Sequence, residues 1–140
     1  MGAQKKYLSS GGFKEYLYHQ VGDTISANGI TGKVIAKTGG QPGHDGLPLY
    51  SNTSKVYFKL DEHGMIEQAR IYDGRKAVYD IDWGHVHDDF KIGMVHIHAF
   101  SYTSNGDVDR KQRNARFLND EEMEKYGALL KKANPNIKFR

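Results

Sequence analysis

Apolar and polar residues alternate between Lys55 and Tyr102, and short turns interrupt the alternation. A period of two is typical of β-strands that bury one face. The pattern predicts four successive strands: Lys55–Leu60, Met65–Tyr72, Lys76–Trp83 and Met94–Tyr102. Because short turns join the first three, neighbouring strands are predicted to run antiparallel, as in a β-meander.

The first third of the chain predicts a helix, a hairpin and a loop. Phe13–Val21 carries apolar residues at helical spacing, which favours a short N-terminal helix. Asn28-Gly29 separates two short apolar runs, a strong β-hairpin signal because both residues tolerate positive φ. Residues 38–54 hold four glycines and two prolines and are predicted to form a long loop. Residues 1–12 are predicted to be mobile.

A second helix is predicted over residues 119–133. Asn119 is a good N-cap, and Glu122 stands three residues later in the capping-box position. Met123, Tyr126, Leu129 or Leu130, and Ala133 form its apolar stripe. The chain is therefore predicted to be a single α+β domain, residues 1–140, with an antiparallel meander of about four strands, an N-terminal hairpin, and a helix from each end packed on one face.

The alternation also assigns side chains to the two faces of the predicted sheet. We predict that the packed face carries Val56, Phe58, Leu60, Met65, Ala69, Ile71, Tyr79, Ile81, Trp83, Val95, Ile97 and Ala99. The opposite face would carry Lys55, Tyr57, Lys59, Gln68, Arg70, Asp80, Asp82, His96 and His98. Folding alone does not require histidines, carboxylates and basic residues together on one sheet face. Residues 55–102 are therefore expected to carry a functional site.

Four of the seven histidines lie in two His-x-His pairs, His85 with His87 and His96 with His98. On a strand, His96 and His98 would share one face about 6–7 Å apart. Buried or surface histidines without a function remain an alternative interpretation. We interpret Trp83 as a core residue, and His19, His44 and His63 as residues without a role in a site.

Two chemistries fit this histidine cluster. In the first, two of His85, His96 and His98 act as general base and acid in phosphodiester cleavage, because imidazole titrates near neutral pH. Asp82 would fix the tautomer of one ring, and Arg70 would offset charge on the phosphoryl group. This mechanism needs no metal or other cofactor.

In the second, the histidine cluster is a metal site. It would bind a divalent transition metal such as zinc through His85, His87, His96 and His98. His-x-His on a strand also resembles the metal motif of cupins. The glutamate that follows in that motif is missing here, because Ala-Phe-Ser-Tyr-Thr-Ser-Asn follows His98. This departure weakens the cupin interpretation.

Charge is distributed unevenly along the chain. The net charge is +3, but residues 1–40 carry +3, residues 41–109 carry −5 and residues 110–140 carry +5. Basic ends indicate an anionic partner such as a nucleic acid, although a solvated surface would show the same pattern. The candidates for substrate contacts are His87, Tyr57, Lys59, Arg110, Lys111, Arg113 and Arg116.

Composition excludes several classes of protein. The chain has no cysteine, which excludes disulfides, cysteine-ligated metals and thiol nucleophiles. It has no apolar stretch near the roughly 20 residues that span a bilayer, so no membrane span is expected. We also expect no secretory signal, because no apolar run follows Lys5 and Lys6.

Four motifs are similar to those of a known group of domains: Leu-Pro-x-Tyr at Leu47–Tyr50, Gln68–Arg75, Tyr79–His85, and His96-Ile-His98 before a basic stretch. The run from about Leu47 to Arg116 resembles small C-terminal domains of bacterial polymorphic toxins and phage head-morphogenesis proteins. Such domains are grouped with the barnase–EndoU–colicin–RelE nuclease class.

The resemblance implies a curved antiparallel sheet with a catalytic face and metal-independent RNA cleavage that leaves a cyclic phosphate. It implies His85, His96 and His98 as the main site residues, RNA as the partner, and action in the bacterial cytoplasm. A cognate immunity or inhibitor protein would fit the same context. Two alternatives stay open: a non-catalytic phage or host-interaction module that binds nucleic acid or an acidic protein, and a histidine-ligated metal-binding protein.

Overall fold

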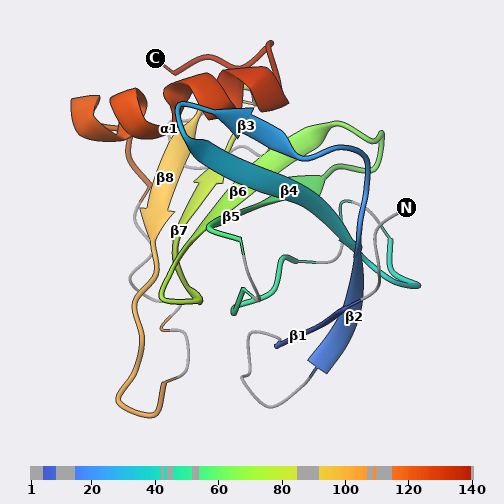
Figure 1. The fold of residues 1–140 in the computed structure, drawn as a ribbon. Coiled ribbons are helices and arrows are strands. Elements are labelled where there is room, and N and C mark those ends of the chain that lie inside the picture. Colours follow the sequence, from blue (N-terminus) through green and yellow to red (C-terminus); the bar gives the residue numbers. More distant parts are fainter. Residues whose placement is uncertain are drawn as a thin grey trace.

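The structure is a computed structural model, and it describes residues 5–8, 15–41, 43, 46–51, 54–84, 92–106, 109 and 115–139. Within these ranges, one helix and a mixed β-sheet make up the α+β fold that the sequence predicts (Figure 1). The elements in chain order are β1 (Lys5–Leu8), β2 (Glu15–Gln20), β3 (Ile25–Ala27), β4 (Ile30–Lys37), β5 (Val56–Leu60), β6 (Ile66–Asp73), β7 (Lys76–Asp82), β8 (His96–Ala99) and α1 (Asp120–Ala133).

Seven of the strands follow one another across the sheet in the order β1-β2-β4-β5-β6-β7-β8, and β3 pairs with β4 beside this path. From β5 to β8, each strand pairs antiparallel with the next. The sheet as a whole is not an antiparallel meander, because β4 and β5 run parallel. A parallel pair needs a long connection, and the predicted long loop of residues 38–54 lies at this point of the chain.

The predicted N-terminal helix is wrong. Glu15–Gln20, within the predicted Phe13–Val21, forms strand β2 and pairs with both β1 and β4. Periodicity does not separate helix from strand in a short apolar run, and here long-range pairing decides the structure. The segment predicted to be mobile, residues 1–12, contributes β1, and its other residues lie outside the described ranges.

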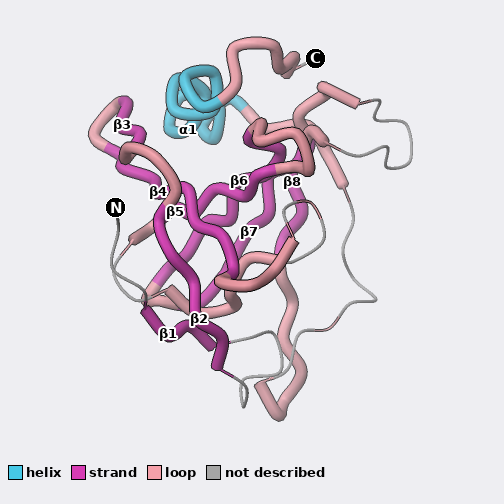
Figure 2. Tube along the Cα trace, turned by 90° about the vertical axis from the view of Figure 1, so that its right-hand side faces the viewer, coloured by secondary structure: helices cyan, strands magenta, loops and turns pink. Residues whose placement is uncertain are grey.

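Local signals predicted two other elements correctly. Asn28 and Gly29 have φ angles of 52° and 78°, so both central residues of the β3–β4 turn are left-handed. The Asn119 side chain accepts from the Glu122 backbone N–H, and the Glu122 side chain accepts from the Asn119 N–H. This is the predicted capping box at the start of α1. The helix lies beside β3 and β4, and the β1–β2 pair lies at the other end of the molecule (Figures 1 and 2).

The first hydrophobic core lies between the sheet and α1. It joins the predicted inward residues of β5 to β8, such as Phe58 and Ile81, to Tyr126, Leu129 and Leu130 of the helix. Trp83 is buried in it, as predicted, and donates its indole N–H to the carbonyl of Ile66. Two residues assigned to this face are exposed instead: Met65 lies in the turn before β6, and Ala99 ends β8.

The polar face of the sheet is covered, which the alternation does not predict. A second core contains Tyr57, Tyr72 and Ala77 from the meander, Tyr18 and Ile35 from β2 and β4, and Leu47 and Leu49 from the long loop. Residues 46–51, here called the strap, lie over this face and are held by hydrogen bonds from several strands. The polar residues on this face are therefore largely buried.

Candidate functional site

Strand register places the predicted site residues in two rows across the covered face. Arg70 of β6 lies opposite Asp80 of β7, which lies opposite His98 of β8. In the next row, Gln68 lies opposite Asp82, which lies opposite His96. Opposite residues of paired strands project to the same side of a sheet. The shared face predicted for these side chains is therefore confirmed by the pairing of the strands.

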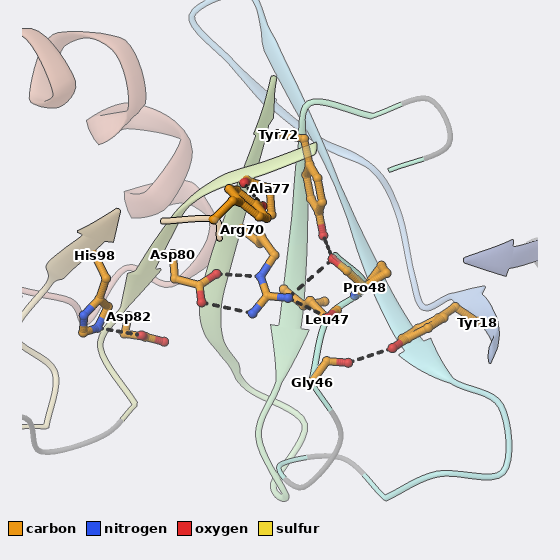
Figure 3. A network of polar contacts seen from close by, with 11 residues as sticks. Tyr18, Gly46, Leu47, Pro48, Arg70, Tyr72, Ala77, Asp80, Asp82 and His98 are labelled. Atoms are coloured by element: carbon orange, nitrogen blue, oxygen red, sulfur yellow. Dashed lines mark hydrogen bonds and ion pairs between the residues drawn. The ribbon is translucent and has the colours of Figure 1, made fainter. Parts of the chain in front are cut away.

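At the β7–β8 end, Asp82, His96 and His98 form a compact cluster. The Nε2 atom of His98 lies 3.2 Å from the Oδ2 atom of Asp82, a contact that Figure 3 shows. The rings of His96 and His98 meet edge to face, with centroids 5.1 Å apart and an interplanar angle of 81°. One nitrogen of each ring and one carboxylate oxygen lie within 4.8 Å of one another. We call Asp82, His96 and His98 the His–Asp cluster.

Hydrogen bonding sets the orientation of both rings. The Nδ1 atom of His96 lies 3.1 Å from the carbonyl oxygen of Met94. A carbonyl can only accept, so Nδ1 of His96 is the donor in this contact. In the contact with Asp82, Nε2 of His98 donates to a carboxylate oxygen, which can only accept.

The cluster is poorly exposed to solvent. His96 is 1% exposed and His98 7%, whereas the Asp82 side chain is 16% exposed. Electrostatic interactions are stronger in such a setting than in water. Asp82 is the member of the cluster that solvent reaches most easily.

Arg70 does not lie free on this face. Its Nε and Nη2 atoms donate to the two carboxylate oxygens of Asp80 at 2.7 and 3.0 Å, and Nη1 donates to the carbonyls of Leu47 and Pro48 (Figure 3). Burial lowers the pKa of Arg70, but the charge and hydrogen bonds of Asp80 outweigh that effect and raise it. These contacts hold the strap on the sheet, which differs from the phosphate-binding role predicted for Arg70.

Two aromatic residues belong to the same assembly. Tyr72 donates to the carbonyl of Pro48 at 2.5 Å, and burial raises the pKa of its hydroxyl well above the ordinary value. Tyr57 is fully buried and meets Tyr72 edge to face, with centroids 5.2 Å apart. The Tyr57 ring is fully buried, so the structure shows no exposed surface of this residue for the substrate contact predicted for it.

The described basic residues among the predicted contacts are already paired. Lys59 lies 3.3 Å from the carboxylate of Glu67, and its side chain is 13% exposed. Arg116 donates to both carboxylate oxygens of Glu122, at 2.6 and 2.9 Å. Its backbone also exchanges two hydrogen bonds with Ile97, so Arg116 lies beside β8, the strand that carries both histidines.

Five predicted site residues lie outside the described residues: His85, His87, Arg110, Lys111 and Arg113. The structure therefore brings together Asp82, His96 and His98 from the predicted set, with Arg70 in the neighbouring row. Sequence reasoning missed Asp80 as the partner of Arg70 and Met94 as the acceptor for His96. Asp80 could have been found from the sequence, because opposite charges at matching positions of paired strands favour one another.

Comparisons with protein-family models, with curated proteins and with solved structures gave no match to this chain. The geometry of the site therefore carries the functional argument. Within the described ranges, α1 has 14 residues, and no helix is long and apolar enough to cross a membrane.

Proposed function

We propose that the chain is a small ribonuclease-like enzyme that cleaves RNA by proton transfer through His96 and His98. The observation that carries this proposal is the His–Asp cluster: two imidazoles with ring centroids 5.1 Å apart, one of them 3.2 Å from a carboxylate. Two neighbouring imidazoles supply the base and the acid that cleavage beside a ribose 2′-hydroxyl needs.

In the proposed reaction, one imidazole takes the proton of the 2′-hydroxyl while the 2′-oxygen attacks the phosphorus. The other imidazole donates a proton to the 5′-oxygen as the bond from phosphorus to that oxygen breaks. The products are a 2′,3′-cyclic phosphate and a free 5′-hydroxyl. Asp82 orients His98 through the contact of its Oδ2 atom with Nε2 of the ring.

Charge in the neighbouring row supports binding of an anionic substrate. Asp80 lies opposite His98, and its negative charge would repel a phosphodiester there. Arg70 neutralises this charge through two hydrogen bonds to Asp80. In this proposal Arg70 is a positioning residue that neutralises Asp80 and holds the strap. Contacts with the RNA backbone are assigned to the basic stretch Arg110–Arg116.

The test is cleavage of total RNA and transfer RNA by the purified full chain in the presence of EDTA. We expect His96→Gln and His98→Gln each to lower the rate by about 100-fold or more, because positioned general acids and bases contribute about 10²–10⁴-fold. His63→Gln is the matched control, because His63 is exposed in a turn far along the chain from the cluster. Circular dichroism checks that each variant folds.

Three results would contradict the proposal. The first is intact RNA after long incubation with the wild-type chain. The second is a wild-type rate in both cluster variants. The third is binding of RNA without cleavage, which would instead support the non-catalytic binding module.

A further inference from the structure

We propose that Asp82, His96 and His98 bind a divalent transition metal ion of the zinc type, and that the bound ion switches off the proton transfer proposed above. The second half of this statement rests on the proposed function, whereas the binding itself rests on geometry alone. Among the residues that the structure describes, these three form a group whose possible ligand atoms converge within 4.8 Å.

The distances fit one small ion. Zinc binds nitrogen and carboxylate oxygen at about 2.0–2.2 Å, which places neighbouring tetrahedral ligand atoms about 3.3 Å apart. The contact of 3.2 Å between His98 and Asp82 is already close to that value. The other separations among the three ligand atoms are at most 4.8 Å, so they exceed the tetrahedral value by no more than about 1.5 Å.

The donor types select the metal. Two imidazoles and one carboxylate suit zinc and other first-row transition ions, whereas magnesium and calcium favour sites built from oxygen. Three protein ligands leave a fourth position of a tetrahedral ion for water or an anion. Because Asp82 is the most exposed member of the cluster, we infer that the ion enters beside it.

The surroundings of His96 support the same assignment. Histidine ligands of metals commonly donate their second ring N–H to a carbonyl or carboxylate, which fixes the ring and aims the other nitrogen. The contact of Nδ1 with the carbonyl of Met94 does this for His96, so Nε2 is the nitrogen that would coordinate the ion. Met94 lies two residues before His96, so this orientation is built into the entry to β8.

A bound ion would block the proposed chemistry directly. A nitrogen that coordinates zinc has used the lone pair that would accept a proton, so the ion would occupy the acid and the base together. Metal binding and RNA cleavage would then exclude each other at the same side chains. Zinc would therefore inhibit the enzyme, and a chelator would restore it.

Zinc binding is measured first, without RNA, by calorimetric titration of zinc chloride into the EDTA-stripped and dialysed full chain. We expect one ion per chain, and at least a tenfold loss of affinity in His96→Gln, His98→Gln and Asp82→Asn. His19→Gln and His63→Gln are controls and keep wild-type affinity, because these residues lie outside the cluster. The visible absorption of cobalt(II), used in place of zinc, provides a second readout of coordination in folded protein.

RNA cleavage is then measured with and without one equivalent of zinc. Inhibition that EDTA reverses supports the switch, and stimulation by zinc overturns it.

The absence of stoichiometric binding overturns the metal site itself, as does unchanged binding in all three cluster variants. Loss of binding in His85→Gln and His87→Gln, with full binding in Asp82→Asn, overturns the ligand set. If the wild-type chain cleaves no RNA at all, the proposed function and the switch that rests on it both fail, and the binding data still decide the metal site.

Discussion

Individual residues on the covered face are held by buried charge pairs whose partners come from different strands. Arg70 and Asp80 are the strongest example, because the arginine side chain is 11% exposed, the aspartate side chain is 2% exposed, and both carboxylate oxygens accept hydrogen bonds. Removing one member of such a pair leaves the other charged and buried. This pair should therefore matter more to stability than any surface ion pair of the chain.

We predict that Asp80→Asn lowers the free energy of unfolding by about 3–5 kcal/mol, because Arg70 keeps its charge in a buried site. Urea denaturation of wild type and variant gives the difference. The double variant Arg70→Met with Asp80→Leu should be more stable than Asp80→Asn, because it removes both charges. Asp73→Asn is the matched control, because Asp73 is exposed at the end of β6. Equal stability of Asp80→Asn and the control would contradict this account of Arg70.

Among the elements, α1 has the best-defined terminus, because its capping box and a neighbouring ion pair share Glu122. The hydrogen bond from Arg116 lowers the pKa of Glu122, burial opposes this effect, and the Asn119 N–H lowers the pKa further. The same hydrogen bond raises the pKa of Arg116. Glu122 thus links the start of α1 to Arg116, which lies beside β8.

The lowered pKa of Glu122 predicts how stability depends on pH. A carboxyl group with a lower pKa in the folded than in the unfolded state contributes its full stabilisation above its ordinary pKa. That stabilisation is lost as the pH falls through the lower folded value. Glu122→Gln should therefore be less stable than wild type near pH 7, and the difference should shrink in acid.

Thermal melts from pH 7 to pH 3 test this, with Glu121→Gln as the exposed neighbouring control. A difference that stays constant with pH would contradict the prediction.

The elements also show what sequence could and could not predict. Strand parity placed Asp82, His96 and His98 on one face correctly, because the period of two depends only on local geometry. The same rule could not predict that the face is covered, because the strap is held by Arg70 and Tyr72, which are more than 20 residues away. The β2 strand was missed for a related reason, since its pairing with β4 is a long-range interaction.

At the scale of the whole molecule, one sheet separates two cores. The first core packs β5 to β8 against α1, and the second packs the strap, β2 and β4 against the other side of β5 to β7. The His–Asp cluster lies at the β8 end of the covered face, whereas the strap contacts β6 and β7. This arrangement keeps both histidines on one strand, as the proton transfer proposed above requires.

The two cores should contribute to stability independently. Leu49→Ala, in the second core, should lower the free energy of unfolding by about 2–5 kcal/mol, and Ile81→Val, in the first, by about 0.5–1.5 kcal/mol. Because the two residues belong to different cores, the double variant should equal the sum within about 0.5 kcal/mol. Ile81→Val with Ile97→Val is the matched comparison, because these residues lie directly opposite each other in β7 and β8 and should couple. Urea denaturation of all the single and double variants measures both couplings. A larger coupling for the Leu49 pair than for the Ile97 pair would mean that the sheet does not separate the two cores.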